Sequence, residues 1–164
     1  MKYRKYKDKA ELTEDFTFVH KAKIYIIPEG FVFDGASIPV VFRWIIGKPF
    51  DKKFIIAALI HDWLYTVHLF SRLESDELFY ENLINSKVGI NKAKIMFSAV
   101  RIGGSGAWIN TRDDIDQIEF LMTKLVKDGK DLSQYDFGAY RELKDIILGE
   151  QEITFNLDRF TEEY

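Results

Sequence analysis

Two adjacent ionisable residues, His61 and Asp62, lie inside the most apolar stretch of this chain. The segment 54–67 contains only two other polar residues, Tyr65 and Thr66. A helix that is apolar on nearly every side is normally buried, and a buried carboxylate must be paired, protonated or bound to a metal. Because a histidine can serve as general base or metal ligand, the pair indicates a functional site.

The helical spacing of these residues leaves two interpretations open. Neighbours on a helix point about 100° apart, so His61 and Asp62 would flank one cleft or hold one ion rather than bond each other. Tyr65 lies one turn beyond His61, on the same side. In the structural alternative, Asp62 bonds to Arg72 or Arg101. His61 is then a core histidine with its hydrogen bonds satisfied.

A second group of candidate residues surrounds the Asp34-Gly35 turn. Asp34 follows a short predicted strand, and Ser37 precedes a predicted helix, which is a favoured position for site residues. We predict Asp34 as a catalytic or metal-binding residue and Ser37 as a substrate contact. The alternative is turn and capping chemistry alone, because Asp34 suits an Asx turn and Ser37 suits a helix cap.

The chemistry available to this site follows from the residue types. The chain has no cysteine, so a metal would have nitrogen and oxygen ligands, which suits Zn, Mn, Mg, Ca or Fe. The predicted ligands of such a divalent ion are Asp34, His61, Asp62 and Asp76. The predicted catalytic residues are His61, Asp62 and Asp34, and the predicted substrate contacts are Ser37, Tyr65, Arg72 and Arg101. No phosphate loop, dinucleotide fingerprint or H-E-x-x-H pattern is present.

Length and charge favour one soluble domain over residues 1–164, with a net charge of −3. The N-terminal residues 2–9 contain five lysines and arginines with two tyrosines between them, which suits either nucleic-acid binding or a solvated edge strand, and we favour the edge strand. No signal peptide is evident, and the apolar run 54–60 is too short to span a membrane.

The order of predicted elements is strands first and helices after. Aromatic and β-branched runs predict strands at 15–19, 23–27 and 31–33, with a hairpin turn at 20–22. Apolar periodicity and capping residues predict helices at 40–46, 53–68, 72–85, 91–102, 111–127 and 137–148, and a closing strand at 152–157. This order predicts an α+β fold, with a small N-terminal antiparallel sheet packed on a helical bundle.

Several of these motifs together resemble a family of phage and prophage proteins, the one catalogued as domain of unknown function 1353. The residues that carry the resemblance are 33–39, 57–65, Ser71-Arg72 with Asp76, Leu78-Phe79, 101–104 and 107–108. The resemblance covers residues 31–108 and leaves 109–164 as a helical C-terminal extension. It implies a phage or prophage origin, in a virion or the host cytoplasm, and it implies no established activity.

The spacing His61-Asp62-x-x-Tyr65 also resembles the catalytic helix of secreted phospholipases A2, in which the histidine is a general base and the aspartate a calcium ligand. Their cysteines and glycine-rich calcium loop are missing here. His-Asp phosphohydrolases share the adjacent His-Asp pair with this chain, but they need further metal-binding histidines.

Two functions therefore stay open from the sequence. One is a small hydrolase, dependent on a divalent metal, that uses the His-Asp site. The other is a non-enzymatic virion component or host-directed binding protein, with other phage or host proteins as partners. In that case His61, Asp62, Asp34 and Arg72 would form a structural polar network.

Overall fold

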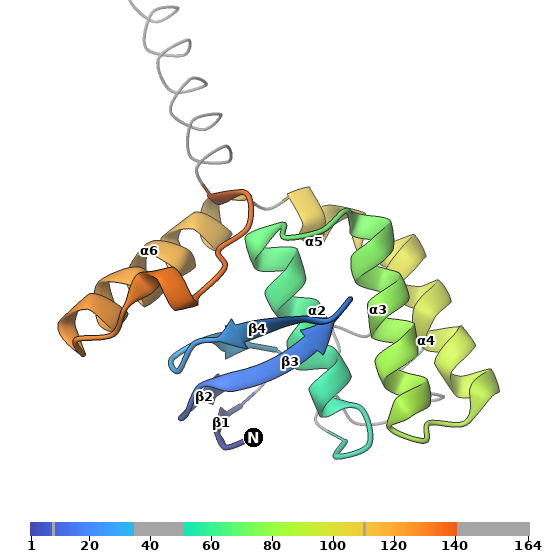
Figure 1. The fold of residues 1–164 in the computed structure, drawn as a ribbon. Helices are drawn as coiled ribbons and strands as arrows, with labels where there is room; N and C mark the ends of the chain where they lie inside the picture. Colours follow the sequence, from blue (N-terminus) through green and yellow to red (C-terminus); the bar gives the residue numbers. More distant parts are fainter. Residues whose placement is uncertain (8, 35–50, 110, 141–164) are drawn as a thin grey trace, which may run out of the picture.

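The computed structural model describes residues 1–7, 9–34, 51–109 and 111–140. Within these residues short strands come first and helices follow, as Figure 1 shows. The predicted α+β fold, with a small antiparallel sheet region packed on helices, is confirmed.

The strands form two small antiparallel sheets. The first contains β1 (Tyr3–Tyr6), β2 (Lys9–Leu12) and β5 (Val32–Phe33) in the order β1-β2-β5. The second is a hairpin of β3 (Phe16–His20) and β4 (Lys23–Ile27). The basic N-terminal segment is therefore an edge strand of the described sheet, as predicted, and its lysines suit that position.

The β3–β4 hairpin turns through two residues, Lys21 and Ala22, whose φ angles of 47° and 60° lie in the left-handed region. Such a two-residue turn matches the twist of the flanking strands. On the inner face Phe18 stacks on its cross-strand partner Tyr25, with ring centroids 5.2 Å apart. The three strands predicted at 15–19, 23–27 and 31–33 thus agree with β3, β4 and β5 to within a residue or two.

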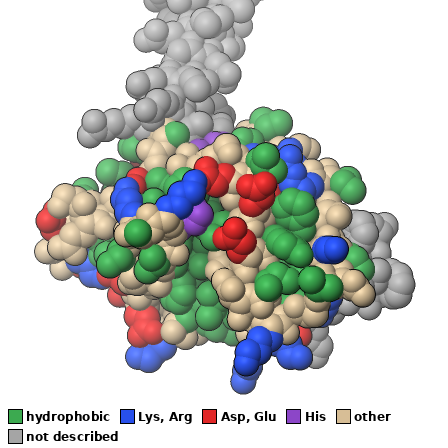
Figure 2. Space-filling model, turned by 45° about the vertical axis from the view of Figure 1, so that its right-hand side comes forward, with side chains coloured by type: hydrophobic (Ala, Val, Ile, Leu, Met, Phe, Trp, Pro, Cys, Tyr) green, Lys and Arg blue, Asp and Glu red, His purple; other side chains and the backbone are tan. Residues whose placement is uncertain are grey.

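The helices form the second layer. They are α2 (Ile55–Val67), α3 (Arg72–Asn85), α4 (Ile90–Gly103), the short α5 (Ser105–Ile109) and α6 (Thr111–Lys127). In Figure 1, α2 lies at the centre, with α3 and α4 on one side and α6 on the other. α3 packs against both α2 and α4, and α6 packs directly on α2. Figure 2 shows that the face turned forward there mixes apolar side chains with both signs of charge.

The chain folds locally as its capping residues predict. The Ser71 side chain accepts a hydrogen bond from the Glu74 amide at 3.2 Å, which starts α3 at Arg72. α2 ends where His68 adopts a left-handed φ of 49°. Among the described residues, no helix is both long and apolar enough to cross a bilayer.

The main core lies between the strands, α2 and α6. Trp63 is completely buried at its centre, with Phe31 edge-on to its ring at 5.1 Å. Ile118 and Leu121 of α6 are completely buried in the same cluster, so α6 is part of this core. A smaller cluster around Phe79 joins α2, α3 and α4.

Two parts of the prediction need correction or stay untested. The predicted helix 137–148 does not begin at Phe137, because Gly138 has a left-handed φ of 55°. Residues 141–148 of that predicted helix, the predicted helix 40–46 and the predicted strand 152–157 lie outside the described residues. A 3-10 turn, η2 (Leu132–Gln134), was not predicted.

Candidate functional site

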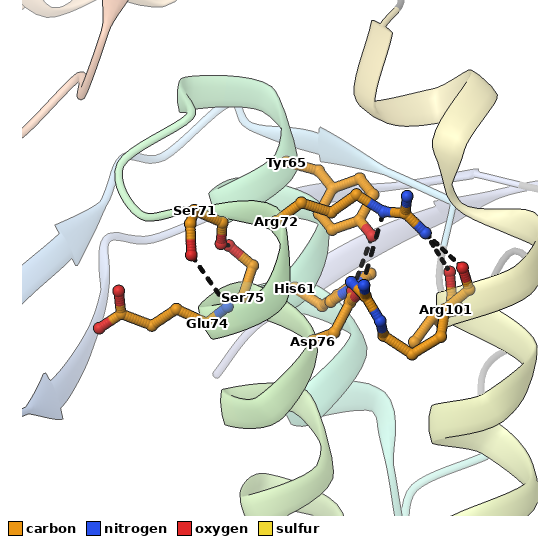
Figure 3. A network of polar contacts seen from close by, with 9 residues as sticks. His61, Tyr65, Ser71, Arg72, Glu74, Ser75, Asp76 and Arg101 are labelled. Carbon is orange, nitrogen blue, oxygen red and sulfur yellow. Dashed lines mark hydrogen bonds and ion pairs between the residues drawn. The ribbon is translucent and has the colours of Figure 1, made fainter.

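The carboxylate of Asp76 on α3 is the centre of a buried polar network, shown in Figure 3. Asp76 is completely buried. Its Oδ1 atom lies 2.7 Å from Nε2 of His61 and accepts a second hydrogen bond, also 2.7 Å, from the Tyr65 hydroxyl. His61 and Tyr65 are four residues apart on α2, so both side chains point from one helix face to the same acceptor.

The other oxygen of Asp76 faces two arginines. Arg101, in the last turn of α4, donates from Nη1 to Oδ2 at 2.6 Å. Nε of Arg72, one turn before Asp76 on α3, lies 3.9 Å from the same oxygen. The carboxylate therefore connects three helices, and its two oxygens have separate sets of partners.

Arg72 also binds the end of α4. Its Nη2 atom donates to the carbonyl oxygen of Arg101 and lies 3.5 Å from that of Val100. These carbonyls belong to the last turn of a helix, where the macrodipole favours a cation. Arg72 thus fixes the position of α4 relative to α3.

The surroundings shift the pKa values of the acid and the phenol in opposite directions. Burial alone would raise the pKa of Asp76, but hydrogen bonds from His61, Tyr65 and Arg101 together lower it below its ordinary value. Burial, reinforced by the bond to Asp76, raises the pKa of Tyr65 well above its usual range. Asp76 is therefore a carboxylate at neutral pH and Tyr65 a neutral donor.

Aromatic rings surround the network. The His61 ring lies 4.2 Å from that of Tyr65 and 4.9 Å from that of Phe79, measured between centroids. Trp108 of α5 meets Tyr65 edge-on at 5.0 Å and lies 4.0 Å from His68. Burial lowers the pKa of His68. With these rings around it, the His61 side chain is 9% exposed.

Most of the predicted site residues come together here. His61, Tyr65, Arg72, Asp76 and Arg101 form one connected network. The two arginines that the structural alternative assigned to Asp62 converge instead on Asp76, one turn into α3.

The other predicted residues lie elsewhere or are not described. Asp62 is half-buried at the next position of α2, and Asp34 is exposed just after β5. Ser37 lies outside the described residues. The sequence patterns did not indicate the contributions of Phe79 and Gly104 to the site. A Cβ atom on Gly104 would lie 2.8 Å from the Tyr65 hydroxyl, and the only signal for this was the glycine run that ends α4.

The predicted metal site remains a prediction. Within the ranges that the structure describes, no group of three or more His, Asp or Glu side chains is placed to hold a metal ion. Asp76, one of the four predicted ligands, already accepts hydrogen bonds from three side chains.

A small α+β fold with a buried His-Tyr-Asp-Arg network defines the protein structurally. Residues 10–100, more than half of the chain, match the family described as "Protein of unknown function (DUF1353)", and the chain belongs to this family. The match includes every network residue except Arg101, which follows directly after it.

Two curated proteins of Sinorhizobium fredii (strain NBRC 101917 / NGR234) are similar to this chain. One, "Uncharacterized protein y4iH", is 39% identical over 67 residues, which are 41% of this chain and 28% of that protein. The other, "Uncharacterized protein y4jT", is 33% identical over 103 residues, or 62% of this chain and 31% of that protein. The chain thus spans about a third of the length of these relatives. No solved structure matches the chain significantly.

Proposed function

We propose that the protein is a hydrolase in which His61 is the general base and Asp76 orients it. The observation that carries this proposal is the 2.7 Å contact between Nε2 of His61 and the completely buried Oδ1 of Asp76. A histidine held by a buried carboxylate on one ring nitrogen presents the other nitrogen for proton transfer.

The hydrogen-bond partner of His61 assigns a role to each of its ring nitrogens. An ionised carboxylate can only accept, so the proton of neutral His61 lies on Nε2 and the lone pair on Nδ1. In the proposed reaction Nδ1 takes a proton from a water molecule as its oxygen attacks the carbon or phosphorus of an ester. His61 then returns that proton to the leaving oxygen as its bond breaks, and Asp76 stabilises the imidazolium in between.

Tyr65 and Arg101 are positioning residues in this proposal. Tyr65 shares Oδ1 of Asp76 with His61, and Arg101 holds Oδ2. Together they prevent the carboxylate from rotating away from the imidazole. Neither hydroxyl nor guanidinium needs to touch the reacting atoms for this effect.

A divalent ion at Asp62 and Asp34 is the untested part of the proposal. Such an ion would polarise the ester and lower the pKa of a bound water molecule. None of the steps above depends on it. Elemental analysis of purified wild type beside Asp62→Asn tests this part: a stoichiometric ion that disappears in the variant supports it, and no ion in either protein contradicts it.

The proposed function is tested with chromogenic carboxylic and phosphoric esters, assayed with chelator and with added divalent ions. We expect His61→Gln to lower kcat by about 10²–10⁴-fold, the usual contribution of general acid–base catalysis. His20→Gln is the matched control, because His20 lies on β3 beside Glu74 and outside the network. Equal activity in wild type and His61→Gln, or no wild-type activity on the whole panel, would rule out the proposal.

One observation favours a second, non-enzymatic function. The network buries Asp76 completely and bonds three helices together, which also suits a structural role in a virion component or host-directed binding protein. In this case Asp62→Asn and His61→Gln would lower stability without changing any chemistry. Unfolding measurements beside the activity assay separate the two functions, and co-purification from infected cells would identify protein partners.

A phage or prophage origin is also proposed here, on the motif resemblance alone. The two relatives are bacterial proteins, which is compatible with a prophage but does not require one. Genes for phage structural proteins next to this gene would support the origin. Detection of the protein in purified particles would place it in the virion, and its absence there would favour the host cytoplasm.

A further inference from the structure

The buried network carries more positive than negative charge. It contains one carboxylate, that of Asp76, and two guanidinium groups, those of Arg72 and Arg101. Even with His61 neutral, the group has an excess of one positive charge. The α4 carbonyls that Arg72 binds contribute dipoles but no net charge. An anion at this position would restore neutrality.

The hydrogen-bonding capacity of the two arginines is only partly used. A guanidinium has five N–H donors, and the described bonds involve Nη1 of Arg101 and Nη2 of Arg72. Nε of Arg72 is buried on the side of Asp76, and Arg72 also interacts with Tyr65, so the donors left for a ligand are the remaining Nη N–H groups of the two arginines. The side chains retain 34% exposure at Arg101 and 23% at Arg72, so both can still be reached from solvent.

Both arginines are held in place by their inner contacts. Figure 3 shows the two guanidinium groups approaching Asp76 from different helices, with Arg72 lying across towards the end of α4. A guanidinium that is already fixed loses little entropy when it binds a ligand. Its planar fork matches the oxygens of a phosphate, which can accept two parallel hydrogen bonds.

We propose that Arg72 and Arg101 bind a phosphate group, and that the protein's substrate is an ester that carries one. The claim about the substrate rests on the proposed hydrolase function, whereas the phosphate site does not depend on it. The excess charge, the unused donors and the partial exposure all concern the same two side chains. A neutral ester would leave the charge excess uncompensated.

Inorganic phosphate is the probe for this site. Protein labelled with ¹⁵N in its arginine side chains is titrated with phosphate at constant ionic strength, and the Nε–H signals are followed by NMR. We expect the signals of Arg72 and Arg101 to shift along one saturable curve. Arg4, an exposed arginine on β1, is the internal control and should not follow that curve.

Variants test the assignment. Arg72→Gln should weaken phosphate binding at least tenfold, and Arg72→Lys, which keeps the charge but loses the fork, should weaken it less. Arg4→Gln should leave the affinity unchanged. Circular dichroism of each variant checks that the fold is intact, and Arg72→Lys serves if Arg72→Gln does not fold. A parallel response of Arg4 and Arg72 would mean general screening, and no response at all would mean that phosphate does not bind; either result would overturn the proposal.

The phosphate site and the hydrolase can fail separately. Saturable phosphate binding without any ester hydrolysis would leave an anion-binding site and remove the proposed enzyme. Hydrolysis of neutral 4-nitrophenyl acetate, with no phosphate binding and no inhibition by phosphate, would support the enzyme and contradict the phosphate site.

Discussion

Nη1 of Arg101 lies 2.6 Å from Oδ2 of Asp76, which bonds the last turn of α4 directly to the buried face of α3. The guanidinium and the imidazole of His61 therefore hold opposite oxygens of one carboxylate. Because Asp76 is completely buried, removal of either partner leaves part of its charge uncompensated.

The first prediction concerns Arg101→Gln. A fully buried ion pair costs about 3–5 kcal/mol when one partner is removed, but the Arg101 side chain is about a third exposed. We therefore expect the free energy of unfolding to fall by about 1.5–3 kcal/mol, the range for a hydrogen bond to a charged group. Urea denaturation measures this, with Arg4→Gln, expected to change stability by less than about 0.5 kcal/mol, as the surface control. Equal stability of the two variants would contradict the central role of Asp76.

The second prediction compares two glycines of the α4–α5 connection. A Cβ atom at Gly104 would lie 2.5 Å from the Val100 carbonyl oxygen and 2.8 Å from the Tyr65 hydroxyl, whereas one at Gly106 would meet nothing within 4 Å. Gly104→Ala should therefore lower stability by about 1–3 kcal/mol, since the neighbours must move.

Gly106→Ala is the matched control, because Gly106 lies in the exposed helix α5. This change should leave stability unaltered or raise it by up to about 1 kcal/mol, as expected for alanine in a helix. Thermal unfolding followed by circular dichroism distinguishes the pair. A harmless Gly104→Ala would mean that the end of α4 does not approach Tyr65 as described.

Much of the fold could be predicted because its signals are local. Runs of aromatic and β-branched residues predicted β3 and β4, and Ser71 as a cap with Glu74 at the capping-box position predicted the start of α3. The buried His61 was predicted from its apolar surroundings. By contrast, β2 is short and of mixed polarity, and the sequence analysis did not identify it.

The partners within the site were harder to predict because they depend on helix packing. Asp76 lies on α3, and only the packing of α3 against α2 brings its carboxylate to His61. The i,i+4 spacing of Arg72 and Asp76 was a usable local signal. The distance between Arg101 and Asp76, by contrast, depends on how α4 crosses α3.

The third prediction is a pH effect of Tyr65. The pKa of Tyr65 is raised in the folded protein. The contribution of its protonated hydroxyl to the free energy of unfolding is therefore complete below the unfolded-state pKa of about 10, and it is lost as the pH rises through the folded-state pKa. Above pH 10 the unfolding free energy of wild type should therefore fall more steeply than that of Tyr65→Phe.

Absorbance of tyrosinate gives an independent readout of Tyr65. When tyrosinate absorbance is followed against pH, Tyr65→Phe should lack one ionisation step that wild type shows, and this step should lie at the alkaline end of the titration curve. A difference spectrum that appears near pH 10 instead would show that the hydroxyl is not held by Asp76.

The fourth prediction tests whether α6 belongs to the main core. Leu121 is completely buried, and its neighbour Phe120 is 62% exposed. Leu121→Ala should therefore lower the free energy of unfolding by about 2–5 kcal/mol, and Phe120→Ala by less than about 0.5 kcal/mol. Chemical denaturation should also show a single transition for wild type. Two transitions, or a harmless Leu121→Ala, would mark α6 as a separate unit.

The strands are attached to residues 130–136, and this attachment has a consequence for folding during synthesis on the ribosome. Asp15, just before β3, accepts bonds from Lys130 and from Tyr135, 120 positions later. On the hairpin, Lys23 of β4 pairs with Asp136. The first strands emerge long before these partners exist. They therefore remain incompletely covered until the segment that follows α6 leaves the exit tunnel, and folding of the N-terminal part is completed only then.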